Sequence, residues 1–372
     1  MTEAMTRAER EESSAFGHPE VPPDATAGYG PGPDQVVDFY LPRGPLPAPS
    51  ARAVATPPEP RTGAGAAPAP GAGSHPGRPD AAPGRDPVPL VVLLHGGAWR
   101  APYDRRHLSP LAGHLAAHGF AVASVEYRRG RDGGRPAAGA GAPPAGQARP
   151  LAGRWPETFD DIAAALDALP ALVRGLSGPG WSALDAERPI LVGHSAGGHA
   201  ALWAAARHRL PAGTPWRLPA PPALRGVVAL APIADFATAR ALAVCSDAVD
   251  ELLELPASSP APGPAALHSA APGSAAPAAA TPAAAAPGAA VAHRLACTDP
   301  VALLPTGVAT TVVQGADDVD VPPAVAEAFV AAADAAGQPV RLVRIADVGH
   351  FPAIDPATPA ARTVLMEIAR LV

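Results

Sequence analysis

One short stretch decides the fold of this chain: Pro189-Ile190-Leu191-Val192-Gly193-His194-Ser195-Ala196-Gly197-Gly198-His199-Ala200-Ala201-Leu202. It reads as an apolar strand, a tight turn that carries one serine, and an alanine-rich helix. A serine on such a turn has strained backbone angles, and bulky neighbours would clash with the strand or helix. The N-terminus of the following helix favours negative charge at the turn. Gly193 to Gly197 therefore fits Gly-x-Ser-x-Gly, the pattern of a nucleophile elbow.

On both sides of this stretch, apolar runs of strand length alternate with helical patterns. Residues 88–94 form a continuous apolar run, which is typical of a strand buried on both faces of a mostly parallel sheet. The alternation predicts a doubly wound α/β fold with helices on both faces, whose ligands bind beyond the carboxyl ends of the strands. We expect strands at 35–41, 88–94, 120–127, 189–194, 225–231, 308–313 and 340–345, and helices at 104–118, 157–173, from the serine turn to about 209, 247–255, 323–336 and 358–371.

The domain organisation follows from composition. Residues 1–26 are polar, charged and proline-containing, which predicts a disordered N-terminal tail. Residues 27–372 are expected to form a single domain. Three segments rich in proline, alanine, glycine or serine interrupt it at about 45–86, 131–150 and 256–292. They have too little apolar surface to offset the entropy of ordering, so we interpret them as insertions that do not belong to the core.

Charge and cysteine content narrow the class of protein. The net charge of −6 shows no basic excess, so no nucleic-acid partner is expected. The two cysteines, Cys245 and Cys297, make neither a disulfide framework nor a metal cluster, and they indicate two thiols in a reducing compartment. The N-terminus lacks the apolar segment of a secretory signal, and no uninterrupted apolar run is long enough to span a membrane. A cytoplasmic location is the expectation.

The serine needs a base, and the base needs a carboxylate to orient it. Among the 12 histidines, His350 is the preferred base, because it follows a predicted strand and Gly349 gives its loop conformational freedom. The acid lies after the preceding predicted strand, where Asp317, Asp318 and Asp320 compete, and the residues alone do not separate them. The order Ser, Asp, His is the one that accompanies a nucleophile elbow in an α/β sheet.

A glycine turn after residues 88–94 contains the other candidate residues of the predicted site. Gly97 and Ala98 there, together with Ala196 after the serine, carry backbone N–H groups that are candidates for an oxyanion hole. Trp99, Tyr103 and His194 are candidates to line a substrate pocket, with core packing an equal alternative for the first two. His95 is expected to order the loop by hydrogen bonding, and His199 to be structural.

These residues resemble the α/β-hydrolase superfamily, specifically its esterase/lipase-like branch with a His-Gly-Gly-x-Trp oxyanion loop. The matching stretches are 29–31, 38–42, 95–99, 127–128, 193–198, 315–322 and 349–351. The chain is similar there to hormone-sensitive-lipase-type carboxylesterases and to kynurenine formamidase. In that branch the acid stands three residues after the glycine and four before the proline of Gly-x-x-Asp-x-x-Val-Pro, which implies Asp318. The resemblance likewise implies Gly97, Ala98 and Ala196 as oxyanion donors and a fold of the α/β-hydrolase type.

The sequence thus predicts a metal-independent serine hydrolase without a cofactor, which cleaves a small carboxylic ester through an acyl-enzyme formed on Ser195. The alternative is an arylformamidase that acts on N-formylkynurenine or similar amides, since its motifs would look the same. A hydrolase-fold binding protein without activity is disfavoured by the complete set Ser195, Asp318 and His350. The natural substrate and the oligomeric state are left open.

Overall fold

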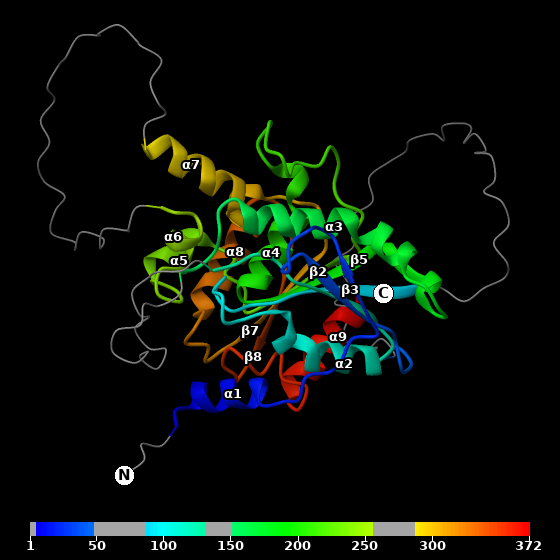
Figure 1. The fold of residues 1–372 in the computed structure, drawn as a ribbon. Helices are drawn as coiled ribbons and strands as arrows, with labels where there is room; N and C mark the ends of the chain where they lie inside the picture. Colours follow the sequence, from blue (N-terminus) through cyan, green and yellow to red (C-terminus); the bar gives the residue numbers. More distant parts are fainter. Residues whose placement is uncertain (1–4, 48–86, 131–150, 256–286) are drawn as a thin grey trace, which may run out of the picture.

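In the computed structural model, residues 5–47, 87–130, 151–255 and 287–372 are described, and they form one eight-stranded sheet with helices on both faces (Figure 1). The strand order is β1-β2-β4-β3-β5-β6-β7-β8. The pairs β1–β2 and β2–β4 are antiparallel, and all other neighbours are parallel. The strands are β1 (Ala25–Gly28), β2 (Val36–Tyr40), β3 (Val88–Leu94), β4 (Ala121–Val125), β5 (Leu184–His194), β6 (Gly226–Leu230), β7 (Thr310–Gly315) and β8 (Arg341–Ile345).

The central strands are buried on both faces, as the continuous apolar run predicts. Every residue of β3 after Val88 is buried, and β3 pairs in parallel with β5 so that Leu94 lies opposite Gly193. Because parallel strands end at the same edge of a sheet, the residues that follow β3, β5, β7 and β8 meet at one edge. This register brings the candidate catalytic segments together.

Two hydrophobic layers sandwich the sheet. One layer contains Phe159, Trp203 and Phe329, and the other contains Leu115 and Val364. In Figure 1, α3, α4 and α8 cover one face, while α2 and α9 cover the other. The predicted doubly wound arrangement is confirmed. The helices are α1 (Arg7–Phe16), α2 (Ser109–Ala117), α3 (Glu157–Gly175), α4 (Ala196–Ala205), α5 (Phe236–Ala241), α6 (Ala248–Leu252), α7 (Pro287–Thr298), α8 (Pro323–Ala335) and α9 (Pro359–Ala369).

The N-terminal segment differs from the prediction of a disordered tail over residues 1–26. Residues 7–16 form α1, which starts with a capping box in which the Thr6 and Glu9 side chains bind each other's backbone N–H. Ala15 is buried, and the Ser14 hydroxyl donates to Asp355 at 2.6 Å. Residues 25–28 then form the edge strand β1. The charged composition suggested disorder, but this segment forms a helix that packs against distant parts of the chain.

The three predicted insertions fall mostly on residues 48–86, 131–150 and 256–286, which lie outside the described residues. The end of the third one differs from the prediction, because residues 287–292 belong to α7. The helix α5 was also not predicted from the sequence; Asp235 caps it by accepting from the Thr238 N–H. Within the described segments, no helix is both long and apolar enough to cross a membrane.

Candidate active site

Ser195 occupies the sharp turn between β5 and α4. Its φ of 56° and ψ of −117° are strained for a residue with a side chain, and its backbone N–H donates to the Leu230 carbonyl at 2.8 Å. The flanking glycines have no room for a side chain. A Cβ on Gly193 would lie 2.0 Å from the Gly197 carbonyl oxygen, and one on Gly197 would lie 2.1 Å from that of Leu94. The Gly-x-Ser-x-Gly pattern is therefore required by packing at this turn.

His350, in the loop after β8, forms a buried pair with Asp318, in the loop after β7. The His350 Nδ1 and the Asp318 Oδ2 are 2.7 Å apart, and both residues are at most 5% exposed. Asp318 Oδ1 also accepts from the backbone N–H groups of Asp320 at 3.0 Å and Val321 at 2.8 Å. Gln314 Nε2 donates to Asp318 Oδ2 at 3.1 Å. This carboxylate is fixed from three sides and holds the imidazole in one orientation.

The three aspartates that the sequence leaves open have different surroundings. Asp318 is the one that contacts His350, whereas the Asp317 side chain is 46% exposed and pairs with Arg7 of α1 at 2.6 Å. Burial raises the pKa of the Asp320 carboxyl, which lies near His350. Asp318 is thus the aspartate that pairs with His350, and its role as the catalytic acid stays a prediction.

Electrostatics favour the protonated form of His350. Burial by itself would lower the pKa of this imidazole, and the charge and hydrogen bond of Asp318 act in the opposite direction. Asp320 and Glu12 of α1 add smaller contributions in the same direction, so the pKa of His350 is raised. The imidazole is therefore a stronger base than an isolated histidine and can take up a proton from a neighbouring hydroxyl.

His194 links the serine turn to the His350 loop. Its Nε2 donates to the His350 carbonyl oxygen at 3.0 Å, and the two rings are 4.5 Å apart. Burial and the neighbouring His350 lower the pKa of His194 well below the ordinary range, so its ring is neutral. Among the described residues, neither the Oγ of Ser195 nor the Nε2 of His350 takes part in a hydrogen bond. Both atoms are therefore without a hydrogen-bond partner in this part of the chain.

The glycine loop after β3 lies against the serine turn. A Cβ on Gly96 would lie 3.2 Å from the Ser195 Cβ. The next three residues have positive φ angles, 97° at Gly97, 50° at Ala98 and 55° at Trp99. Two of these three carry side chains, so the surrounding structure must stabilise a strained backbone.

Three backbone N–H groups border this site, those of Gly97, Ala98 and Ala196. Across the described segments, none of them donates to an acceptor in the protein. Ala196 is the first residue of α4, so its N–H has no partner within the helix. Unpaired N–H groups of this kind are the donors that an oxyanion hole requires, and that role stays a prediction for these three residues.

The three predicted pocket residues lie in different environments. Trp99 is fully buried, with its ring 5.3 Å from His199 and 6.4 Å from Phe236. It packs in the core beneath the loop. His194 is buried at the serine turn, as described above. Tyr103 is partly exposed, and burial raises the pKa of its hydroxyl. Contact of these residues with a substrate stays a prediction.

Sequence reasoning missed several residues around the site. Glu11 of α1 accepts from the Gly349 N–H at 3.3 Å, and Phe16 packs on Phe351 with ring centroids 5.4 Å apart. Glu126, at the end of β4, accepts a hydrogen bond from His95 at 3.0 Å. A charged residue at the end of an apolar strand was the one available signal for Glu126. No sequence signal connects α1 with a loop more than 300 residues later.

The described residues offer no cluster of three or more His, Cys, Asp or Glu side chains that could hold a metal ion. Cys245 and Cys297 are free thiols. Burial raises the pKa of Cys245 to about 12 and also raises that of Cys297, so neither is a reactive thiolate at neutral pH.

The fold and this site define a hydrolase of the α/β type. The chain belongs to the alpha/beta hydrolase family, whose sequence model matches residues 91–362. No curated protein sequence matches the chain.

Solved structures with the same fold span nearly the whole chain. Esterase B from Lactobacillus rhamnosis is 17% identical with a TM-score of 0.56, covering 98% of this chain and 90% of that one. A truncated carbohydrate esterase from gut microbiota is 14% identical with a TM-score of 0.53, covering 94% and 96%. Thermogutta terrifontis esterase 2 is 13% identical with a TM-score of 0.52, covering 95% and 94%. At these identities the likeness concerns the fold.

Proposed function

We propose that this protein is a serine esterase that cleaves a small carboxylic ester through an acyl-enzyme intermediate. The observation that carries the proposal is the 2.7 Å contact between His350 Nδ1 and Asp318 Oδ2, next to a strained turn that presents Ser195. That contact leaves the other imidazole nitrogen for a substrate-facing role. Several solved structures with the same fold are esterases, which supports ester chemistry.

In the first half of the reaction, Ser195 Oγ attacks the ester carbonyl carbon while His350 Nε2 takes the hydroxyl proton. Asp318 keeps Nδ1 protonated and stabilises the imidazolium that forms. The negative oxygen of the tetrahedral intermediate accepts from the N–H groups of Gly97, Ala98 and Ala196. His350 then gives its proton to the leaving alkoxide oxygen, and the alcohol departs.

In the second half, water attacks the acyl carbon on Ser195 and gives its proton to His350. The second tetrahedral intermediate uses the same three N–H groups. Collapse releases the carboxylic acid and returns the proton from His350 to Ser195 Oγ. The cycle needs no group beyond these side chains and backbone amides.

The proposal is tested with p-nitrophenyl acetate and two serine variants. Ser195→Ala is expected to lose at least about 10³-fold in kcat, because the nucleophile is gone. Ser182→Ala, a change at an exposed serine, serves as the control and should keep full activity. Full ester turnover by Ser195→Ala would disprove the proposal.

A substrate panel separates the ester from the amide alternative. Short p-nitrophenyl esters and N-formylkynurenine are compared by kcat/KM on the same preparation. The proposal expects the esters to be the better substrates. A clear preference for N-formylkynurenine would replace the esterase with an arylformamidase that uses the same residues.

A further inference from the structure

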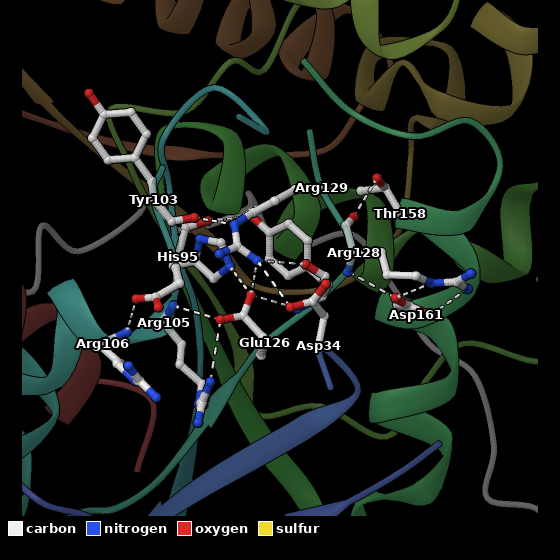
Figure 2. A network of polar contacts seen from close by, with 12 residues as sticks. Asp34, His95, Tyr103, Arg105, Arg106, Glu126, Arg128, Arg129, Thr158 and Asp161 are labelled. Atoms are coloured by element: carbon white, nitrogen blue, oxygen red, sulfur yellow. Dashed lines mark hydrogen bonds and ion pairs between the residues drawn. The ribbon is translucent and has the colours of Figure 1, made fainter. Parts of the chain in front are cut away.

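Glu126 is a buried carboxylate at the end of β4, outside the candidate triad, and it connects several parts of the loop that contains Gly97 (Figure 2). It is 2% exposed. Its Oε1 accepts from His95 Nε2 at 3.0 Å and from Arg129 Nη1 at 2.6 Å. Its Oε2 accepts from the backbone N–H of Arg105 at 3.0 Å. One side chain therefore contacts both the first residue of the loop, His95, and its end at Arg105.

Arg129 strengthens the same connection. Its Nε donates to the Tyr103 carbonyl oxygen, so the ion pair with Glu126 also fixes the middle of the loop (Figure 2). Burial opposes ionisation of Glu126, but His95 and Arg129 outweigh it and lower its pKa to about 2. Glu126 is consequently a carboxylate at neutral pH, able to accept hydrogen bonds and unable to donate one.

His95 has an oxygen acceptor at each ring nitrogen. Nε2 faces the Glu126 carboxylate, and Nδ1 lies 2.9 Å from the carbonyl oxygen of Gly96. A carbonyl and a carboxylate only accept, so a hydrogen bond at each of these positions requires the ring nitrogen to be the donor. The ring is fully buried and stacks on Tyr127 with centroids 4.2 Å apart and planes within 5°. The Tyr127 hydroxyl donates to the His95 carbonyl at 2.6 Å, which fixes the backbone as well.

The Gly96 carbonyl belongs to the same peptide group as the Gly97 N–H. A donor on that carbonyl draws electron density away from the peptide nitrogen, and hydrogen bonds in such chains strengthen one another. The Gly97 N–H becomes a better donor to a negative oxygen. It also stays in place, because the φ of 97° at Gly97 is set by a peptide group that His95 holds.

We propose that Glu126 is a positioning residue for hydrolysis: through His95 it orients and polarises the Gly96–Gly97 peptide so that the Gly97 N–H stabilises the oxyanion. This inference rests on the proposed function, since it concerns the transition state of that reaction. Glu126 does not touch the substrate, and its effect passes along one side chain and one peptide group.

Asp38 provides a matched control for Glu126. It is also a buried carboxylate, 5% exposed, and it binds the same Arg105 side chain, with Nε to Oδ2 at 2.6 Å. Among the residues that the structure describes, its other hydrogen-bond donor is the Thr26 hydroxyl at 2.6 Å, and none of its hydrogen bonds there reaches His95 or Gly96. Asp38→Asn thus removes a carboxylate from the same cluster and leaves the chain from Glu126 to Gly97 intact.

The kinetic test compares Glu126→Gln with Asp38→Asn on p-nitrophenyl acetate. Glutamine keeps an acceptor and the side-chain shape but removes the negative charge that His95 Nε2 faces. We expect kcat to fall on the order of tenfold in Glu126→Gln with KM unchanged, because the oxyanion exists only in the transition state. Complete loss of an oxyanion donor costs more, about 10²–10³-fold. Asp38→Asn should keep kcat within about twofold.

Two kinetic results would overturn the inference. One is an unchanged kcat in a folded Glu126→Gln protein. The other is an equal loss in Asp38→Asn, which would mean that the whole charge cluster, and not the link to His95, sets the rate. If Ser195→Ala is inactive while Glu126→Gln keeps full activity, the esterase proposal stands and this inference alone falls. If Ser195→Ala is fully active, the esterase proposal itself falls.

A spectroscopic test needs no Glu126 variant and so does not depend on whether one folds. The ¹⁵N chemical shifts of the His95 ring are measured in the wild-type protein near neutral pH, with a His95→Gln protein to assign the signals. Both nitrogens are expected at the shifts of protonated imidazole nitrogens. An unprotonated nitrogen on His95 in the wild-type protein would contradict the inference.

Discussion

The protein contains two buried pairs of a carboxylate and a histidine at the same edge of its sheet, and they have different surroundings. Asp318 and His350 are 2.7 Å apart, and Glu126 and His95 are 3.0 Å apart. In each pair the carboxylate also accepts from backbone N–H groups. The chemistry of the two pairs is set by the second ring nitrogen.

The Nε2 of His350 has no hydrogen-bond partner in the described protein, and the proposed mechanism uses this nitrogen for proton transfer. The Nδ1 of His95 lies 2.9 Å from the Gly96 carbonyl oxygen, so both nitrogens of that ring face oxygen atoms of the protein. Under the two proposals, a histidine paired with a carboxylate is thus a base in one place and a support for the oxyanion loop in the other. The comparison teaches that the role of a histidine follows from what binds both of its nitrogens.

The largest expected effect comes from breaking the first pair. Asp318→Asn should lower kcat by about 10⁴-fold, because the amide no longer holds the imidazole in the tautomer that accepts the serine proton. Steady-state hydrolysis of p-nitrophenyl acetate measures it. The matched change Asp317→Asn removes an adjacent carboxylate that is 46% exposed, and it should alter kcat less than about twofold. Similar losses in both variants would show that Asp318 has no special role.

Breaking the second pair should affect stability more than the rate. Glu126→Gln leaves the partly buried Arg105 and Arg129 side chains without the carboxylate that they share. The free energy of unfolding near neutral pH should therefore fall by about 3 kcal/mol. Because the pKa of Glu126 is lowered to about 2, its stabilising contribution is complete above the unfolded value of about 4.3 and is lost as the pH falls toward 2.

Urea unfolding of the wild type and Glu126→Gln at several pH values measures this contribution. The difference between the two proteins should shrink below about pH 4. A difference that does not change with pH would mean that the charge of Glu126 is not what stabilises the fold.

The smallest expected effect concerns the pKa of His350 and its dependence on neighbouring carboxylates. Its pKa is raised, so the acid limb of kcat/KM should have its midpoint above the ordinary histidine value of about 6.5. Glu12 and Asp320 contribute to that rise. Removing either negative charge makes the imidazolium less stable, so Glu12→Gln and Asp320→Asn should each move the limb to lower pH by about 0.3 unit.

The control for this shift is Glu187→Gln, which changes a carboxylate that is 73% exposed and pairs with Arg174. It should leave the midpoint in place. A shift to higher pH in Glu12→Gln or Asp320→Asn would contradict the expected direction of the change in the pKa of His350. Equal shifts in all three variants would mean that the net charge of the protein, and not these two neighbours, changes that pKa.

The sequence predicts the sheet well because its central strands are continuous apolar runs. Residues 88–94 were predicted with the bounds that the structure has, and parallel pairing then brings the ends of β3, β5, β7 and β8 to one edge. The serine turn was predictable because packing admits only glycine at Gly193 and Gly197. The choice among three aspartates needed either the resemblance or the contact with His350 itself.

What the sequence did not predict depends on contacts between distant residues. The helix α1 has a charged composition, yet Arg7 pairs with Asp317 and Glu11 binds Gly349. A Cβ on Gly349 would lie 2.1 Å from the Glu11 Oε2, so this glycine is needed for the close approach of α1 as much as for loop freedom. Likewise, Glu126 contacts His95 only because β3 and β4 are neighbours in the sheet.

The central claim is that Ser195 is the nucleophile, and labelling with a fluorophosphonate followed by peptide mass spectrometry tests it most directly. The reagent phosphonylates a serine only where a base and oxyanion donors activate it. We expect one adduct, on the peptide that contains Ser195, with no labelling of Ser195→Ala and slow labelling of Asp318→Asn. An adduct on another serine would contradict the account. So would ester hydrolysis that continues at the full rate after Ser195 has been labelled.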